Sequence, residues 1–194
     1  LQPPSRTVEQ ETVTMVPTKK EYEPTEEAEI LVQAPFAPAE LVFTTRRNGL
    51  AEVRRITAPT GSTTVKVPLK EIFIPGLTVQ VTALGSKVRT DMTGKELPGK
   101  PVRPAFASGS LTLNIANASR KLTVEVTPAA KNLAPGGQTQ LDINLKDSQG
   151  RPVSGEVAVV AVDESVLALT GYKPADPLGS FCSVRSADVL DSHL

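Results

Sequence analysis

Short runs in which apolar and polar residues alternate recur along the first half of the chain, separated by turn-forming residues. A period of two places alternate side chains on opposite faces of a strand, so each run predicts a half-buried β-strand. The predicted strands are residues 12–16, 28–32, 41–45, 51–56, 63–67, 77–84 and 110–115. This number and spacing are typical of a β-sandwich, so we expect an all-β domain of the immunoglobulin or fibronectin-III kind at residues 12–118, after a linker at residues 1–11.

The turn after residues 41–45 is predicted by Asn48-Gly49, because a type I′ hairpin turn needs positive φ at both central residues. The alternation begins again after residue 119, with predicted strands at residues 122–126, 138–145 and 156–162. The last of these is continuously apolar from Val157 to Val162, which predicts a buried strand.

An internal repeat relates the two stretches, because seven positions of the first match seven of the second at a constant spacing. The first set is Pro17, Lys20, Tyr22, Pro24, Ala28, Ile30 and Val32, and the second is Pro128, Lys131, Leu133, Pro135, Thr139, Leu141 and Ile143. The alternative is that any two β-hairpins share prolines and alternation. We favour two tandem domains of related structure, the second at residues 119–194.

The second stretch is too short to complete a sandwich, because its three predicted strands fall well below the roughly seven of an immunoglobulin-like domain. Residues 171–177 and 183–194 show no strand period. We therefore expect a partial second sandwich whose closing strands lie beyond residue 194. Its open edges would be a pairing hazard unless another part of the protein covers them.

Composition narrows the class of protein. Proline makes up 17 of the 194 residues, which disfavours long helices. One Cys and one His exclude both a disulfide framework and a Cys/His zinc cage, so we expect no metal and no cofactor. The formal net charge is zero, which argues against nucleic-acid binding, and no apolar run is long enough for a membrane-spanning helix.

Catalytic chemistry finds little support in the sequence. A nucleophile activated by histidine would depend on His193 near the chain end, and no Gly-rich phosphate loop or Gly-x-Ser-x-Gly motif is present. Asp163-Glu164 could be an acid/base pair, but we favour a structural role in which Asp163 or Ser165 caps a short helix at residues 166–169. The single thiol, Cys182, is expected to be unreactive. We therefore expect a protein that is not an enzyme.

Several motifs resemble those of bacterial-type alpha-2-macroglobulins. The most specific is Asp163-Glu164-Ser165-Val166-Leu167-Ala168-Leu169-Thr170-Gly171-Tyr172, followed by Asp176-Pro177-Leu178 and Phe181. It is similar to the segment that leads into the bait region of that family. Tyr22-Glu23-Pro24, residues 30–32, Ala34-Pro35-Phe36 and Pro104-Ala105-Phe106-Ala107-Ser108-Gly109 resemble parts of the preceding macroglobulin-like domain.

The resemblance implies a fragment of a broad-spectrum protease-trapping inhibitor, with two macroglobulin-like domains that lead into a bait, the exposed segment that a protease cuts. Phe181, Arg185 and Leu190 are the candidate target residues, and Asp163, Glu164 and Tyr172 mark the motif before the bait. Proteases and the other domains of the parent chain would be the partners. A periplasmic, cell-surface or extracellular location is implied in the same way.

Two departures from the family pattern affect this interpretation. The thioester motif Cys-x-Glu-Gln is absent, because Cys182 precedes Ser183, Val184 and Arg185, so covalent capture is not expected in this chain. Pro24-Thr25-Glu26 lacks the glycine that relatives usually carry, so the turn is not expected to use positive φ freely. The alternative function is an adhesion or carbohydrate-binding β-sandwich module, which the low aromatic content disfavours.

Overall fold

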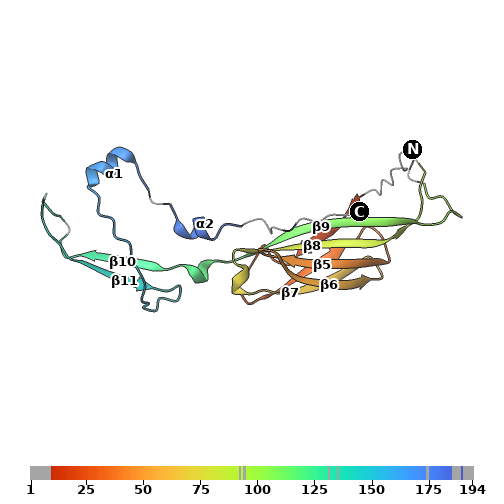
Figure 1. The fold of residues 1–194 in the computed structure, drawn as a ribbon, viewed down its shortest axis with the longest axis horizontal. Helices are drawn as coiled ribbons and strands as arrows, with labels where there is room; N and C mark the ends of the chain where they lie inside the picture. The colour runs from red at the N-terminus through yellow and green to blue at the C-terminus, as the bar shows by residue number, and fades with distance from the viewer. Residues whose placement is uncertain are drawn as a thin grey trace. The chain divides into compact units, whose positions relative to one another are not determined.

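The computed structural model describes residues 10–91, 93, 95–130, 132–134, 136–173, 175–184 and 189. The chain divides into two compact units: the first contains the described residues before Asn117, and the second is Asn117–Ser183. Strands dominate the first unit, whereas the described residues of the second form two strands and short helices (Figure 1). The fold class is therefore all-β, as the alternation of the sequence predicts.

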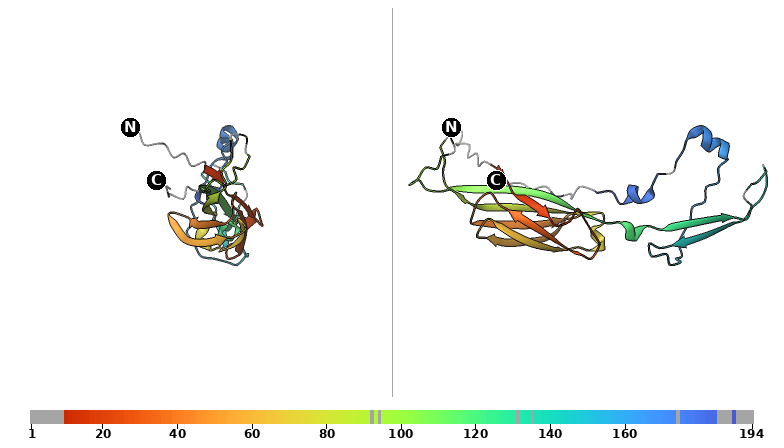
Figure 2. Two further views of the ribbon diagram at one scale, coloured as in Figure 1. Left: turned by 90° about the vertical axis from the view of Figure 1, so that its right-hand side faces the viewer. Right: turned by 180° about the vertical axis from the view of Figure 1, so that it is seen from behind.

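The first unit contains two β-sheets that share one core (Figures 1 and 2). The larger sheet has the order β1-β9-β8-β5-β6, with β3 also paired to β9, and the smaller has the order β2-β4-β7. The strands are β1 (Gln10–Thr12), β2 (Thr14–Pro17), β3 (Glu21–Tyr22), β4 (Glu27–Gln33), β5 (Ala39–Arg46), β6 (Leu50–Ala58), β7 (Ser62–Pro68), β8 (Gly76–Lys87) and β9 (Arg103–Ile115). A 3₁₀ turn, η1 (Glu71–Phe73), precedes β8.

Alternate residues of each central strand point into the core of the first unit. On β4 these are Ala28, Ile30 and Val32, and on β8 they are Leu77, Val79, Val81 and Ala83, all of which are buried. The remaining buried apolar residues are Val13, Tyr22, Phe36, Ala39, Leu41, Phe43, Ala58, Val65, Val67, Leu69, Ile74, Ala105, Ala107, Leu113 and Ile115. Burial of these side chains is the main source of stability for this sandwich.

The first predicted strand, residues 12–16, is interrupted in the structure. The chain leaves the larger sheet after β1, passes through buried Val13, and joins the smaller sheet as β2. The Val13 N–H donates to the Ser108 carbonyl at 3.0 Å, so the crossing remains attached to β9. Alternation alone did not predict this crossing, because the residues on both sides keep a strand-like pattern.

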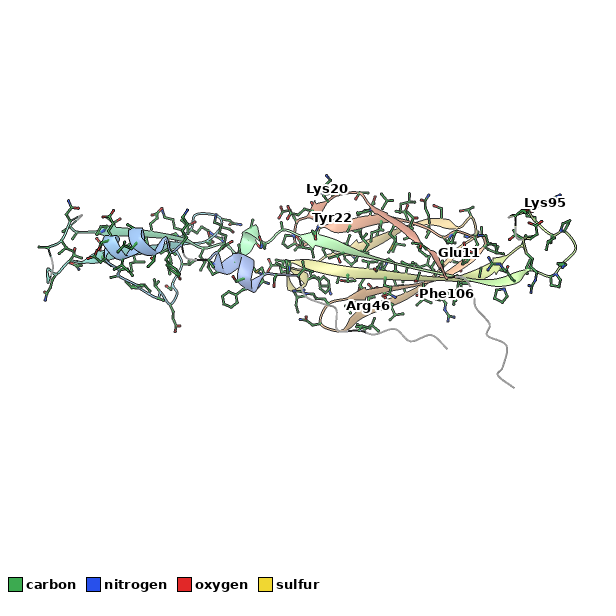
Figure 3. All side chains as sticks on the ribbon, turned by 90° about the horizontal axis from the view of Figure 1, so that it is seen from above. Glu11, Lys20, Tyr22, Arg46, Lys95 and Phe106 are labelled. Carbon is green, nitrogen blue, oxygen red and sulfur yellow. The ribbon has the colours of Figure 1, made fainter. Side chains whose placement is uncertain are left out.

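The predicted turn at Asn48-Gly49 is confirmed, with φ of 50° and 109° at its two residues. This positive φ at both central positions is what a type I′ turn requires. It joins β5 to β6 within the larger sheet. A much longer loop connects β8 to β9, with Lys95 in that loop, well away from Tyr22 (Figure 3).

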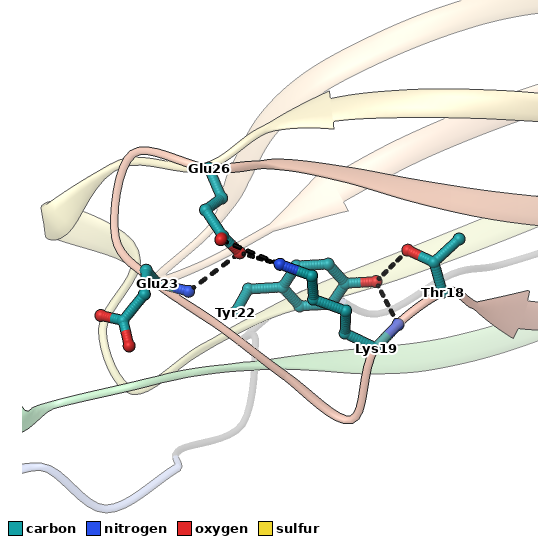
Figure 4. A network of polar contacts seen from close by, with 5 residues as sticks. All are labelled: Thr18, Lys19, Tyr22, Glu23 and Glu26. Carbon is teal, nitrogen blue, oxygen red and sulfur yellow. Dashed lines mark hydrogen bonds and ion pairs between the residues drawn. The ribbon is translucent and has the colours of Figure 1, made fainter.

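A polar network fixes the turn that enters β4 (Figure 4). The Tyr22 hydroxyl accepts from the Lys19 N–H at 3.1 Å and lies 3.2 Å from the Thr18 hydroxyl. The Lys19 ammonium donates to the Glu26 carboxylate at 2.9 Å, and the Glu23 N–H donates to the same carboxylate. The hydrogen bond from Lys19, with that from the Glu23 N–H, lowers the pKa of Glu26.

The turn inside this network does adopt positive φ, contrary to the expectation from the missing glycine. The Glu26 N–H donates to the Glu23 carbonyl, and Thr25 has φ of 84°. Proline at the second position and positive φ at the third define a type II turn, which favours glycine where Thr25 stands. A β-branched residue is strained in this conformation, so the turn keeps its geometry at an energetic cost.

Replacing Thr25 by glycine is expected to raise the free energy of unfolding of the first unit by about 1 kcal/mol. Relief of the strained φ gives about 1–2 kcal/mol, and the greater backbone freedom of unfolded glycine offsets part of it. Urea denaturation followed by circular dichroism measures the change. Thr25→Ala is the matched control, because it removes the side chain and keeps the strain. Equal stabilisation by both variants would contradict this explanation.

The second unit has one β-hairpin, β10 (Thr123–Pro128) and β11 (Leu141–Lys146), preceded by the 3₁₀ turn η2 (Ala118–Arg120). Two short helices follow, α1 (Glu164–Thr170) and α2 (Pro177–Phe181). None of the described residues in this unit is buried. A two-stranded hairpin on its own is marginally stable in water, and the described residues of this unit form no core around it.

The two hairpins of the predicted repeat have the same register. Pro17 pairs with Ile30 in β2–β4, and Pro128 pairs with Leu141 in β10–β11. Both members of the pair shift by the same spacing, from 17 to 128 and from 30 to 141. The repeated segments therefore form equivalent hairpins, which two unrelated hairpins with shared prolines would not be expected to do.

The predicted buried strand at residues 156–162 is wrong for this structure. No strand is formed there, and Val157, Val159, Val160 and Val162 have exposed fractions of 40%, 58%, 83% and 48%. A strand buried on both faces needs neighbours at its edges and layers above and below it. Among the described residues of the second unit, only the β10–β11 hairpin is available as sheet.

None of the helices in the described part of the chain has the length and apolar content needed to cross a membrane.

Candidate functional site

The candidate site is the segment from Asp163 to Ser183, which begins with the helix α1. Asp163 is the N-cap of this helix, with its carboxylate accepting from the Ser165 N–H at 2.8 Å and from the Ser165 hydroxyl. The Ser165 hydroxyl, followed by its N–H, lowers the pKa of Asp163. The predicted capping role is therefore taken by Asp163, and the carboxylate is occupied in holding the helix.

The helix α1 ends where the sequence changes from apolar to polar. Gly171 adopts φ of 60°, and its N–H donates to the Leu167 carbonyl at 2.9 Å, which closes the last turn. Left-handed residues of this kind commonly end helices, and glycine adopts this conformation without a Cβ penalty. Glu164 lies in the first turn and is exposed, and Tyr172, directly after the helix, has an exposed fraction of 67%.

A second helix, α2, follows after six residues and was not predicted from the sequence. Asp176 is its N-cap: its carboxylate accepts from the N–H groups of Leu178 at 3.0 Å and Gly179 at 3.3 Å. Pro177 takes the first helical position, where a missing N–H costs nothing. The Asp-Pro pair is a recognisable helix start, so this signal could have identified α2.

The candidate target residue Phe181 ends α2 and has an exposed fraction of 82%. The thiol-bearing residue Cys182 is partly buried, and its N–H donates to the Leu178 carbonyl at 2.8 Å. Every described residue from Gly171 to Ser183 is exposed except Leu178 and Cys182. The other two candidates, Arg185 and Leu190, lie outside the described residues.

The described residues contain no group of three or more His, Cys, Asp and Glu side chains that could hold a metal ion. His193 lies outside them. Tyr22, Phe36 and Phe43 are buried in the first unit, so they cannot serve as an exposed stacking platform for a sugar. The exposed aromatic side chains of the candidate site are Tyr172 and Phe181.

Comparisons with known proteins match most of this chain. A family model described as the alpha-2-macroglobulin bait region domain matches residues 13–169. An alpha-2-macroglobulin homolog from Nostoc is 29% identical over 157 residues, which cover 80% of this chain and 8% of that protein. An alpha-2-macroglobulin from Pasteurella multocida is 26% identical over 178 residues, covering 89% of this chain and 8% of that protein.

A third match differs in name and extent. The circularly permutated Ras protein 2 of Dictyostelium discoideum is 30% identical over 90 residues, which cover 46% of this chain and 2% of that protein. The chain thus spans less than a tenth of the length of the curated relatives that it matches.

Proposed function

Because the chain belongs to the alpha-2-macroglobulin bait region domain family, we propose that it supplies the scaffold and the bait of a protease-trapping inhibitor. The observation that carries this proposal is the contrast between the packed sandwich of the first unit and the second unit, in which no described residue is buried and, after Gly171, none belongs to a strand. Proteases cut in that segment, and the cut is the signal to which the parent protein responds. The chain itself contributes no catalytic group.

The two units differ in how easily a protease can use their backbone. An endopeptidase binds its substrate as an extended strand, with side chains placed in pockets at alternate positions. The central strands of the first unit have both edges hydrogen-bonded within a sheet, so they cannot pair with a protease without unfolding. The described residues of the range 171–183 lie outside every sheet, and those outside α2 have no strand neighbour to displace, whereas α2 must unwind before its backbone can pair with a protease.

We extend the proposal to the second domain, residues 119–194, as a partial macroglobulin-like sandwich completed by other strands of the parent. The repeat supports this, since β4 pairs on one side with β2 and on the other with β7, whereas β11 pairs only with β10 among the named strands. The exposed apolar run from Val157 to Val162 would be one of the strands of the completed sandwich. Its burial there would remove a large apolar surface from water.

For the parent protein, we propose only the class of its partners and its location. Its partners would be proteases as targets and its own remaining domains, and a periplasmic, cell-surface or extracellular location would bring it to its targets. Covalent capture would belong to another part of the parent, because the sequence Cys182-Ser183-Val184-Arg185 is not a thioester motif.

The test is the position of the first cut made by two proteases of different specificity. Trypsin is expected to cut the chain first after Arg185, and chymotrypsin after Phe181 or Leu190. Because the residue before the cut fills the specificity pocket, Arg185→Ala should slow the first trypsin cut by about tenfold or more. The double variant Phe181→Ala/Leu190→Ala should slow chymotrypsin in the same segment. Intact mass spectrometry of the early products identifies each cut.

Arg89→Ala provides the matched control, because Arg89 is an exposed arginine of the β8–β9 loop in the first unit. This variant should leave the first trypsin cut unchanged in rate and position. First cuts after Arg89, abolished by Arg89→Ala and unaffected by Arg185→Ala, would contradict the proposed function.

A further inference from the structure

We infer that Asp176 controls how fast a protease cuts after Phe181, because it holds the residues before that bond in the helix α2. The inference rests on the proposed function and adds a specificity-determining residue to it. Asp176 lies five residues before Phe181, and α2 consists of Phe181 and the four residues between them. It is therefore a positioning residue that acts through backbone conformation.

The hydrogen bonds of α2 converge on Asp176. Its carboxylate accepts from two backbone N–H groups, those of Leu178 and Gly179. Its carbonyl accepts from the Ser180 N–H at 3.2 Å and the Ser180 hydroxyl at 3.1 Å. One residue thus satisfies three backbone N–H groups of the helix, and a side chain without an acceptor oxygen leaves two of them without their partner.

A protease cannot bind Phe181 while α2 is intact. The side chain is accessible, but the four residues before it are helical, and a protease needs that stretch extended. Only molecules in which α2 has unwound are competent, so the apparent affinity falls by the competent fraction. Stabilising or destabilising α2 therefore changes the cutting rate without any change at the cut residue.

The helix is short enough for a single cap to matter. Isolated helices below about 12 residues are marginal in water, and α2 has five residues. Its least exposed residue, Leu178, lines a hollow of about 620 Å³ together with Leu122 and Val124 of the same unit. Pro177 and Phe181 of α2 line the same hollow. The cap and these few apolar side chains are the features that favour the helix, so removing the cap should shift the equilibrium measurably.

Asp176→Ala is the variant that tests the inference, with Asp176→Asn as its matched control. Loss of the N-cap destabilises α2 and enlarges the unwound fraction. We expect this to increase the rate of chymotrypsin cutting after Phe181 by about fivefold. Asparagine caps helices about as well as aspartate. Chymotrypsin should therefore cut the Asp176→Asn variant after Phe181 at nearly the same rate as the unmodified chain. The control separates capping from charge, because both variants remove the carboxylate. Trypsin cutting after Arg185 serves as the internal reference.

Substitution of Gly179, which lies inside α2, is expected to change the cutting rate in the opposite direction. A Cβ there would meet the Asp176 carboxylate at 3.5 Å, an ordinary contact, so alanine fits. Alanine favours a helix over glycine by enough to slow the cut after Phe181 by about fivefold. Since Gly179 lies near the cut, a peptide of residues 174–188 with each substitution, too short to hold a stable helix, measures any direct effect on the protease.

Faster cutting in Asp176→Ala, an unmodified rate in Asp176→Asn and slower cutting in Gly179→Ala, with equal rates in the peptides, would support the inference. Equal rates in Asp176→Ala and the unmodified chain would overturn it, as would an equal increase in Asp176→Ala and Asp176→Asn. Either result leaves the proposed function standing if the unmodified chain is still cut first after residue 171. If the unmodified chain is cut first in the first unit, the proposed function itself fails.

Discussion

Replacing Phe43 by alanine is expected to lower the free energy of unfolding of the first unit by about 4 kcal/mol. Phe43 has an exposed fraction of 1% on β5, in the middle of the larger sheet. It lies opposite Val81 on one neighbouring strand and Arg54 on the other, and the Arg54 guanidinium lies 5.0 Å from the centre of its ring. The variant loses both the buried ring and this cation–π contact, and it leaves a cavity.

Val124→Ala is the control for Phe43→Ala, because Val124 is an apolar strand residue of the second unit with an exposed fraction of 51%. Its truncation should change stability by less than about 0.5 kcal/mol, since little burial is lost. Urea denaturation followed by circular dichroism compares the two variants. A cost of several kcal/mol for Val124→Ala would contradict the conclusion that the core of the described chain lies in the first unit.

Replacing Gly109 by valine is expected to destabilise the first unit by about 3 kcal/mol. Gly109 lies on β9, where the N-terminal segment crosses between the sheets, and a Cβ built there overlaps the Val13 carbonyl oxygen. The same Cβ would lie 3.3 Å from the Val13 Cβ. Because the obstructing atoms belong to the backbone, the crossing must move or detach, which also breaks the hydrogen bond from Val13 to Ser108.

Ser110→Val tests whether this effect belongs to the crossing. Ser110 is the next residue of β9 and is exposed, so valine there adds the same side chain away from Val13. Its effect should stay within about 0.5 kcal/mol. Equal destabilisation by Gly109→Val and Ser110→Val in urea denaturation would show that β9 tolerates neither substitution, and that the crossing is not the cause.

The strands of the first unit could be predicted from the sequence because all their partners lie in the same unit. Alternation identified β4, β5, β7 and β8, and the structure pairs each of them within a sheet. Alternation did not identify β3, because a strand of two residues, Glu21 and Tyr22, is too short to show a period. Pairing with the end of β9 makes β3 a strand, and pairing depends on tertiary structure.

The second unit was predicted less well for a physical reason. The run from Val157 to Val162 has the composition of a buried strand, but composition describes what a segment does once it is covered. The described chain offers nothing to cover it, so the segment stays exposed and irregular. A prediction from local pattern assumes that neighbouring strands are present to cover the segment. The described residues of this chain do not provide such strands.

The candidate site was partly predictable. The cap at Asp163 followed from the residue types before an apolar turn, although Ser165 remained an alternative until the hydrogen bonds were known. The helix α2 has no strand period, so alternation does not predict it, and its signal in the sequence is the Asp176-Pro177 start. The sequence motif located the segment, whereas the conformation of Phe181 within it required the structure.

The most direct test of the central claim is a time course of digestion of the whole chain by a protease of broad specificity. If the first unit is a closed sandwich and the segment after Gly171 is the bait, the earliest cuts fall after residue 171. A fragment that contains residues 10–116 then persists as digestion continues. Early cuts distributed through residues 28–115, with the segment after Gly171 still intact, would contradict the account.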